Sequence, residues 1–380
     1  MNEARLIIGA DIVPTISNQQ YFENAQMEKI VDEGILTVLN RADYRIFNLE
    51  VPLTDREAPI QKNGPNLIAS TVSAAGMKQL NIDFLTLANN HILDQGEQGL
   101  WSTTRELDKY GISYAGIGCN PGEAAKPHIV EVGNKKIGIY CCAEHEFSIV
   151  NQKRAGANPF DPLESLDHIV CLKAKCDYVI CLYHGGKEHY RYPSPNLQKV
   201  CRKIVEKGAN LVICQHTHCI GCEETWHDGR IVYGQGNFLF DHSKSEFWQT
   251  SLLISLETSN GSIDYIPICK DGNSVRLARD EEKEEILTGF YHRSSQIKEK
   301  GFVETHYAEF AKSMLPLYLS CADSLMSTFA FRLVNKVTGH KLMSKITQKK
   351  LRNHRLSLLN QYECEAHREL ILKGLEASPE

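Results

Sequence analysis

The chain has 380 residues, of which 42% are apolar and 23% charged, so it can bury a large core. A chain of this length and composition predicts one large folded domain with an appendage rather than a small module. The formal net charge of −5 excludes a global basic field, and we expect no nucleic-acid binding. An anionic partner would have to bind at a local site rather than through the net charge of the protein.

The N-terminal residues and the cysteines indicate a cytoplasmic protein. The chain runs directly into Leu6-Ile7-Ile8 without the basic start, long apolar stretch and cleavage site of a signal peptide. No apolar run approaches the roughly 20 residues that span a bilayer. Many of the thirteen cysteines stand inside apolar runs, which is typical of reduced core thiols. Cys219 and Cys222 form a CxxC without a second one, so we interpret both as core residues.

Short β-rich runs alternate with helical patterns from residue 5 to about residue 257. This alternation predicts a layered α/β fold. Amphipathic helices are predicted at Gly99–Tyr110 and at Pro195–Lys207, which Gly208 ends. The predicted strands are Leu6–Ala10, Tyr44–Leu49, Phe84–Ala88, Lys136–Cys142, Tyr178–Tyr183, Asn210–Cys214, Ile231–Tyr233 and Leu252–Leu256.

After about Lys270 the charged run Arg279–Glu285 leads into long helical patterns with almost no strand signal. We therefore predict a catalytic-type domain over residues 1–270 and a mainly helical region over residues 271–380. Within the latter, Arg332–Arg355 contains eight Lys or Arg and no acidic residue. A solvated helix face, peripheral membrane contact, a polyanionic substrate and a protein partner all remain open for this run, as does a homo-oligomer.

The strongest local signal for chemistry is His216-Thr217-His218, directly after a buried strand. In an extended segment, residues i and i+2 project to the same side, so both imidazoles are expected to face one pocket. A structural pair of polar histidines is the alternative for this motif alone. Polar residues at strand ends along one sheet edge are the usual place for a site. Further ligand types follow other predicted strands: Asp11, Glu50, Asn90, His91 and His184.

The order of these residues resembles that of the calcineurin-like metallophosphoesterases, and the local sequences are more narrowly similar to the CapA family of poly-γ-glutamate or capsule synthesis proteins. The resemblance covers about residues 6–257. It implies an α/β/β/α fold, a layered β-sandwich flanked by helices, with a C-terminal helical appendage. The motifs that carry it are Asn48-Leu49-Glu50 with Pro52-Leu53-Thr54, Ala88-Asn89-Asn90-His91 through Asp94-Gln95-Gly96, His184-Gly185-Gly186-Lys187-Glu188, His216-Thr217-His218, and Tyr233-Gly234-Gln235-Gly236-Asn237-Phe238-Leu239-Phe240-Asp241.

The resemblance implies a role for each matching position. Asp11 and His218 would hold one divalent metal, Glu50 would be a bridging or shared ligand, and Asn90, His184 and His216 would complete a second site. His91 would be the general acid, with Asp94 orienting its ring. Oxygen and nitrogen ligands without cysteine favour manganese, iron or zinc. The positions expected to contact substrate or support the ligands are Asn48, Asn89, Glu188, Gln215 and Asn237, where a loop-bracing role is equally open for Glu188 and Asn237.

The chain departs from the superfamily pattern at several positions. Val13 replaces the histidine that usually stands two residues after the first aspartate, which removes a metal ligand. The acid motif ends in Glu50 rather than the usual aspartate, so its bridging role stays open. Gln215 replaces a histidine, and Gly185 replaces a tryptophan that would form an aromatic wall beside the metal.

These features predict a metal-dependent hydrolase acting on an anionic small molecule or polymer. Two cations would lower the pKa of a bound water and neutralise charge on the transition state. The favoured reaction is phosphoester hydrolysis on an intermediate of capsule, exopolysaccharide or poly-γ-glutamate biosynthesis. Two alternatives stay open: cleavage or formation of an amide in a glutamate-type polymer, and a non-catalytic accessory role in capsule polymer assembly.

Overall fold

The computed structural model describes residues 4–241, 243–321, 329–339, 341–364 and 366–371. The chain divides into two compact units, Met1–Val303 and Glu304–Glu380. This division falls after Val303 rather than after residue 270, because β15 (Ile263–Asp271), β16 (Ser274–Leu277) and α8 (Asp280–Gln296) belong to the first unit. The expectation of almost no strand after Lys270 was wrong at β16, whose four residues are too few to show a periodicity.

The first sheet joins the N-terminal strands to the strands that close the first unit. Its order is β16-β15-β14-β1-β2-β3-β4, and β13 pairs with the end of β1. The strands β1 to β4 run parallel, whereas β14 pairs with β1 antiparallel. The remaining strands of this sheet are β1 (Arg5–Ile12), β2 (Tyr44–Leu49), β3 (Phe84–Thr86), β4 (Ser113–Ala115), β13 (Asn237–Leu239) and β14 (Thr250–Glu257).

The second sheet has the order β11-β12-β10-β9-β7-β6. Its central strands β7, β9, β10 and β12 are parallel, and an antiparallel strand closes each edge. Its strands are β6 (His128–Val132), β7 (Lys135–Ala143), β9 (Tyr178–His184), β10 (Leu211–Gln215), β11 (Glu223–Trp226) and β12 (Gly229–Tyr233). A further short pair joins β5 (Ile117–Gly118) to β8 (Gly156–Ala157).

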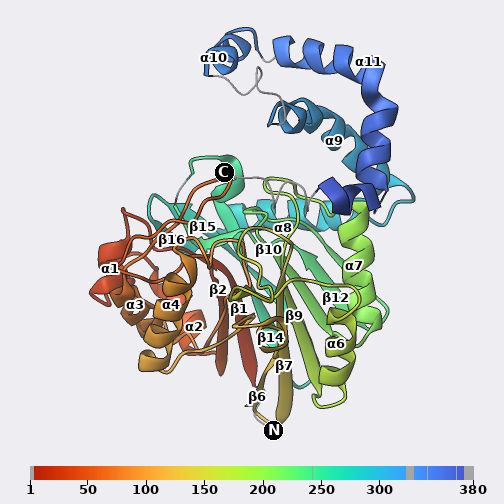
Figure 1. Ribbon diagram of the computed structural model, residues 1–380. Helices are drawn as coiled ribbons and strands as arrows, with labels where there is room; N and C mark the ends of the chain where they lie inside the picture. Colours follow the sequence, from red (N-terminus) through yellow and green to blue (C-terminus); the bar gives the residue numbers. More distant parts are fainter. Residues whose placement is uncertain (1–3, 242, 322–328, 340, 365, 372–380) are drawn as a thin grey trace. The chain divides into compact units, whose positions relative to one another are not determined.

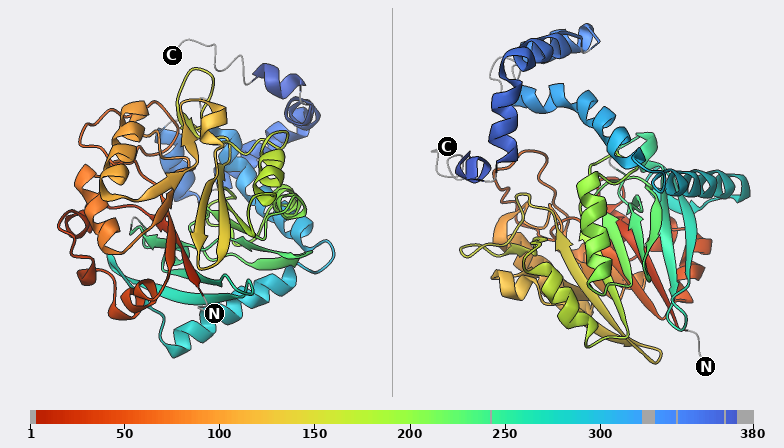
Figure 2. Two further views of the ribbon diagram at one scale, coloured as in Figure 1. Left: turned by 90° about the horizontal axis from the view of Figure 1, so that it is seen from below. Right: turned by 90° about the vertical axis from the view of Figure 1, so that its right-hand side faces the viewer.

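Three hydrophobic clusters define the layers of the first unit. One contains side chains of both sheets, such as Ile8 and Ile213, and therefore lies between them. A second lies between the first sheet and α1 (Gln19–Glu23), α2 (Glu33–Asn40), α3 (Ala74–Gln79) and α4 (Gly96–Tyr110). The third lies between the second sheet and α6 (Ser165–Lys173) and α7 (Pro195–Glu206). The predicted α/β/β/α layering is confirmed (Figures 1 and 2).

Helix α7 illustrates how local sequence positions an element. The Ser194 side chain accepts a hydrogen bond from Leu197 N at 3.0 Å, and Pro195 occupies the first turn, where its missing N–H costs nothing. Its buried face carries Cys201 and Ile204, one turn apart. Gly208, with φ of 118°, adopts the left-handed conformation that ends the helical path.

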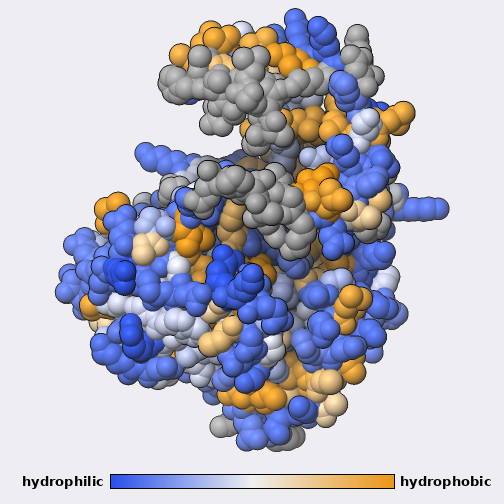
Figure 3. Space-filling view, in the orientation of Figure 1, coloured by the Kyte–Doolittle hydropathy of each residue, from blue (hydrophilic) through white to orange (hydrophobic). Residues whose placement is uncertain are grey.

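The second unit is helical over its described residues. It contains most of α9 (Phe302–Cys321), together with α10 (Phe329–Val337) and α11 (Lys341–Glu363). In the described part of the chain, no helix combines the length and apolar character needed to cross a membrane. The face of the first unit drawn in Figure 3 is mostly hydrophilic with scattered hydrophobic side chains, which is normal for a protein surface.

Candidate metal centre

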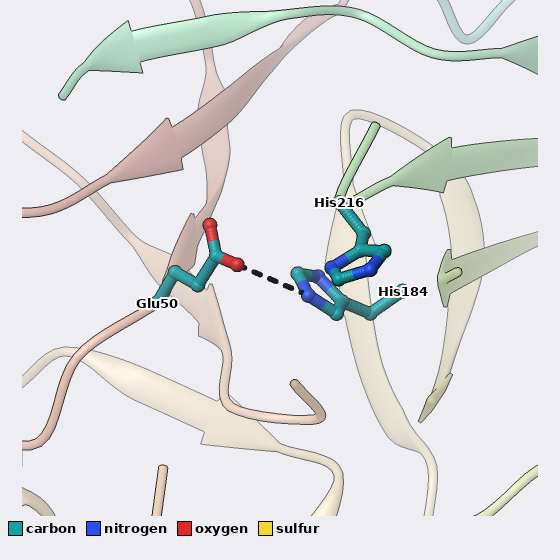
Figure 4. Close-up of side chains that lie close together, drawn as sticks. All are labelled: Glu50, His184 and His216. Carbon is teal, nitrogen blue, oxygen red and sulfur yellow. Dashed lines mark ion pairs between the residues drawn. The ribbon is translucent and has the colours of Figure 1, made fainter. Parts of the chain in front are cut away.

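The carboxyl ends of parallel strands from both sheets meet at one place. Asp11 lies near the end of β1 and Glu50 directly follows β2, so the first sheet supplies two carboxylates. His184 ends β9, and His216 directly follows β10, so the second sheet supplies imidazoles. Figure 4 shows Glu50 facing the His184 ring, with the His216 ring beside it. The layering thus brings together residues that are more than a hundred positions apart.

Glu50, His184 and His216 form the first compact group. Each offers a ligand atom within 4.8 Å of the others, and all three residues are buried. His184 Nε2 lies 3.2 Å from Glu50 Oε1 and 3.0 Å from Asn90 Oδ1. The His184 and His216 ring centroids are 4.9 Å apart. Ligands bound about 2 Å from a single ion are spaced in this way, so the group fits a metal with Asn90 as a fourth donor.

Asp11, Glu50 and His218 form the second group under the same distance limit, and Glu50 therefore belongs to both groups. His218 Nδ1 lies 3.7 Å from Asp11 Oδ2 and 2.9 Å from Asn237 Oδ1. The Asn237 contact fixes the orientation of the imidazole ring. Two ligand groups that share one carboxylate are the arrangement that a dinuclear centre requires.

Unpartnered polar atoms test whether these residues fit cations. Asp11 Oδ2, both carboxylate oxygens of Glu50 and His216 Nδ1 are buried without a hydrogen-bond partner among the described residues. Leaving a buried polar atom unpartnered normally costs about 1–3 kcal/mol. Cations bound to these atoms would remove that penalty. The donor set therefore fits divalent metal ions.

Burial shifts the carboxyl and imidazole groups in opposite directions. Desolvation, reinforced by the charge of Glu50, raises the pKa of Asp11 to about 8. Desolvation likewise raises the pKa of Glu50 to about 8. It lowers the pKa of His218 to about 3 and holds that of His216 well below its ordinary value. Desolvation also lowers the pKa of His184, so the fold favours the neutral form of every member of the two groups.

The His216-Thr217-His218 motif does not adopt the extended conformation that the sequence analysis assumed. Strand β10 ends at Gln215, and His216 and His218 have positive φ of 85° and 53°. Their rings lie 6.0 Å apart and belong to different ligand groups. Because each residue occupies the left-handed region, the alternation of an extended strand no longer applies. Such backbone strain is typical of functional sites.

His91 and Asp94 lie next to this centre in a hydrogen-bonded pair. His91 Nδ1 is 2.5 Å from Asp94 Oδ2, and Asp94 is fully buried. Asp94 also accepts a hydrogen bond from Leu67 N at 2.6 Å and pairs with Lys62 Nζ. The fixed Nδ1 contact orients the ring so that His91 Nε2 is the nitrogen left for chemistry.

The other predicted support residues are mostly part of one buried network. Asn48 donates to Asp11 Oδ1 at 2.8 Å, and Asn89 donates to Asn48 Oδ1 at 3.1 Å. Gln215 is buried, and its Oε1 has no hydrogen-bond partner in the described residues. Glu188 is only half-buried, and its charge helps to raise the pKa of Glu50.

Three residues of the site were missed from the sequence. Lys62 contacts both His91 Nδ1 at 3.2 Å and Asp94, but it lies in a loop without periodicity. Glu146 accepts a hydrogen bond from Asn90 at 3.3 Å, and its position after predicted strand Lys136–Cys142 was a usable signal. Trp248 packs against the His218 ring at 4.5 Å and supplies an aromatic wall. No sequence motif pointed to Trp248.

The CxxC pair lies outside this chemistry. Cys219 and Cys222 are both fully buried. Desolvation raises the pKa of Cys219 to about 11 and that of Cys222 well above its ordinary value. Because the thiolate is the form that binds metal and attacks disulfides, both side chains favour the inert form.

The fold and the site place this protein in the class of layered α/β/β/α proteins that carry a candidate metal centre where the strand ends of the two sheets face each other. Within that class, the chain belongs to the family described as bacterial capsule synthesis protein PGA_cap, whose sequence model matches residues 5–242. The resemblance to the CapA family noted from the motifs is therefore confirmed.

Relatives of this family agree with that assignment. The chain is 25% identical over 274 residues to the PGA biosynthesis protein CapA of Bacillus subtilis, covering 67% of this chain and 69% of the relative. It is 25% identical to the capsule biosynthesis protein CapA of Bacillus anthracis, covering 60% and 59% of the two chains. It is also 24% identical to a probable polyglutamine synthesis accessory protein of Mycobacterium tuberculosis, covering 55% and 59%.

Solved structures show weaker likenesses. A novel phosphatase of Mycoplasma pneumoniae is 14% identical with a TM-score of 0.44, covering 71% of this chain and 95% of that chain. A 5'-nucleotidase precursor from Thermus thermophilus is 14% identical with a TM-score of 0.37, covering 75% and 58%.

Proposed function

We propose that this protein is a metal-dependent phosphoesterase that acts on a phosphorylated intermediate of capsule, exopolysaccharide or poly-γ-glutamate biosynthesis. The observation that carries the proposal is the pair of buried ligand groups that share Glu50, neither of whose oxygens has a hydrogen-bond partner among the described residues. The names of the relatives support the biosynthetic context. A cytoplasmic location and the absence of a nucleic-acid partner stay predictions.

The proposed ligand assignment follows the two groups. Glu50, Asn90, His184 and His216 would hold one ion, while Asp11, Glu50 and His218 would hold the other. Manganese, iron and zinc suit this set of oxygen and nitrogen donors. Bound divalent ions supply positive charge that acidifies a water molecule and attracts the oxygens of a phosphoryl group.

The remaining residues position and move protons. Asn48 and Asn237 orient Asp11 and His218 through hydrogen bonds of 2.8 and 2.9 Å. Protonated His91 would donate the proton on Nε2 to the leaving oxygen, because Nδ1 is held by Asp94. The buried Lys62–Asp94 pair holds that carboxylate in place beside the imidazole.

Metal content and phosphodiesterase activity should be measured together in the same samples. Wild-type protein is expected to carry about two equivalents of transition metal and to hydrolyse a chromogenic phosphodiester, following the dinuclear arrangement. His184→Ala and His216→Ala should lose both properties, whereas the exposed His292→Ala should lose neither. Wild-type protein that takes up no transition metal would sink the proposal.

Two other functions would use the same metal centre. One is cleavage or formation of an amide bond in place of phosphoester hydrolysis, and the other is a binding role without catalysis. The names of the relatives refer to PGA biosynthesis and to a synthesis accessory protein, which favours action on a glutamate polymer or a binding role. Release of glutamate from an amide polymer, without phosphate release from any phosphoester, would select amide chemistry. Metal binding without either product would select the accessory role.

A further inference from the structure

A cavity of about 560 Å³ lies near the metal centre and has no place in the proposed chemistry. It is lined by residues of α8, β15, the Ile220 loop and the single turn η3 (Glu246–Trp248). Glu246 and Gln249, three residues apart, line the cavity, whereas Trp248 packs against the His218 ring at 4.5 Å. The turn η3 therefore separates this cavity from the metal centre.

Three basic residues line this cavity without ion-pair partners among the described residues: Arg191, Lys270 and Arg293. The two arginines carry the positive charge, because burial lowers the pKa of Lys270 to about 7 and its Nζ already donates to Phe240 O. All three residues are half-buried. A fourth basic residue, Arg276, is already paired with Glu282 at 2.6 Å. Glu246 and Glu285 also line the cavity, but both are exposed, so solvent screens their charge.

Backbone carbonyl groups hold the two arginines in place without neutralising them. Arg191 donates to Ile220 O at 3.0 Å, and Arg293 donates from Nε to Gly221 O at 2.8 Å. Arg191 also stacks over the Phe247 ring at 4.9 Å. Burial, together with the charge of Arg191, lowers the pKa of Arg293. An anion between these side chains would relieve that repulsion.

Gly289 lies beside the tip of the Arg293 side chain. It lies inside α8, where glycine is disfavoured relative to alanine. A Cβ atom at this position would lie 3.2 Å from Arg293 Nη1. Glycine therefore leaves room at Nη1, whereas Nε and Nη2 are the nitrogens that donate to backbone carbonyl groups.

We propose that the cavity lined by Arg191, Lys270 and Arg293 binds an oxyanion, a carboxylate or phosphate group, at a site separate from the metal centre. Guanidinium groups match the planar, two-oxygen geometry of such ligands, and prepositioned side chains lose little entropy on binding. The site does not depend on hydrolysis at the metal centre. It would hold a second anionic part of a substrate, or a separate anionic ligand.

Calorimetric titration of the full metal-free chain with inorganic phosphate and with glutarate tests this site. Arg293→Gln should weaken binding roughly tenfold or more, the value expected for a hydrogen bond to a charged group. Gly289→Ala should weaken binding several-fold without loss of melting temperature, because alanine improves the helix while crowding Nη1. His216→Ala should bind as wild type does.

The outcomes divide clearly. Tighter binding of glutarate assigns a carboxylate ligand, and tighter binding of phosphate assigns a phosphoryl ligand. Loss of binding in His216→Ala would place the anion at the metal centre and overturn the proposal. Equal affinities in wild type, Arg293→Gln and Gly289→Ala would overturn it as well, as would no binding of either probe at millimolar concentration.

Discussion

The two halves of the metal centre come from different sheets and respond to burial in opposite ways. The first sheet contributes Asp11 and Glu50, whose pKa values are both raised to about 8. The second sheet contributes His216 and His218, whose pKa values are lowered. Without a cation, each half is most stable uncharged, so the fold avoids burying a net charge. A bound cation would favour the ionised form of the carboxylates and would leave the histidines neutral.

Removing the carboxylate that both ligand groups share should have the largest effect on the metal centre. Glu50→Gln keeps the side-chain volume but removes the only residue common to both ligand groups. We expect loss of bound metal and a fall in phosphodiesterase activity of more than about 100-fold, beyond the effect typical of residues that merely support ligands. Metal analysis and initial rates measure the two effects.

Glu57→Gln is the matched control, since Glu57 is exposed. It should retain metal and activity. A Glu50→Gln variant that still holds two equivalents of metal would show that Glu50 is not the shared ligand.

Removing the predicted general acid should separate activity from metal binding. His91→Asn is expected to lower the turnover rate by about 10² to 10⁴, the usual contribution of a positioned acid. Metal content should stay unchanged, because His91 belongs to neither ligand group. The acidic leaving group of a nitrophenyl ester needs little protonation, so activity on it should fall less than on an alkyl ester. Equal losses on both esters would contradict the assignment.

The pH dependence of the stability of the metal-free protein should reveal the raised pKa values of the carboxylate half. Asp11 and Glu50 have ordinary pKa values of 3.8 and 4.5 and folded values of about 8. Their contribution to stability is therefore complete below about pH 4 and is lost as the pH rises to about 8. His218, lowered from 6.5 to about 3, acts oppositely and loses its contribution as the pH falls through that range.

Within the metal centre, only the carboxylate half changes in this way between pH 6.5 and pH 8. Burial lowers the pKa of Lys270 from 10.5 to about 7, so this residue adds stability as the pH rises, equally in wild type and Glu50→Gln. The melting temperature of protein treated with a chelator should fall over this interval, and Glu50→Gln should flatten the fall by half or more. Added Mn²⁺ should also flatten it in wild type, because bound cations favour the ionised carboxylates. Identical slopes for chelator-treated wild type and Glu50→Gln would count against the buried carboxyl pair.

Sequence patterns were sufficient to predict which strand ends carry candidate ligands. They were insufficient to predict how those residues divide between the two ligand groups. Tyr44–Leu49 was predicted with the bounds that β2 has, because aromatic and aliphatic residues fill most of its positions, as in a buried strand of a parallel sheet. The left-handed conformations of His216 and His218 could not be predicted, because histidine seldom adopts a positive φ and the residue pattern favoured an extended segment. Lys62 reaches the site from a loop and Trp248 from the single turn η3, and neither segment is long enough or regular enough to show a periodicity.

Replacing Lys62 should have the smallest effect of these substitutions and should change activity without changing metal binding, because Lys62 belongs to neither half of the centre. Its side chain is 4% exposed, and it contacts both Asp94 and His91 Nδ1. Lys62→Met removes one charged partner from buried Asp94, while Leu67 N and His91 still contact that carboxylate. We expect about a tenfold loss of activity without loss of metal, as for residues that orient a catalytic group.

Lys109→Met is the matched control and should behave as wild type does, because Lys109 is exposed and a surface pair such as Lys109–Glu106 contributes little. If Lys62 acts by holding Asp94 and His91 in place, its loss should also shift the alkaline limb of the pH–rate profile, where a general acid loses its proton. A purely structural lysine would lower the melting temperature and leave that limb unmoved. Unchanged activity and an unchanged profile in Lys62→Met would remove Lys62 from the site.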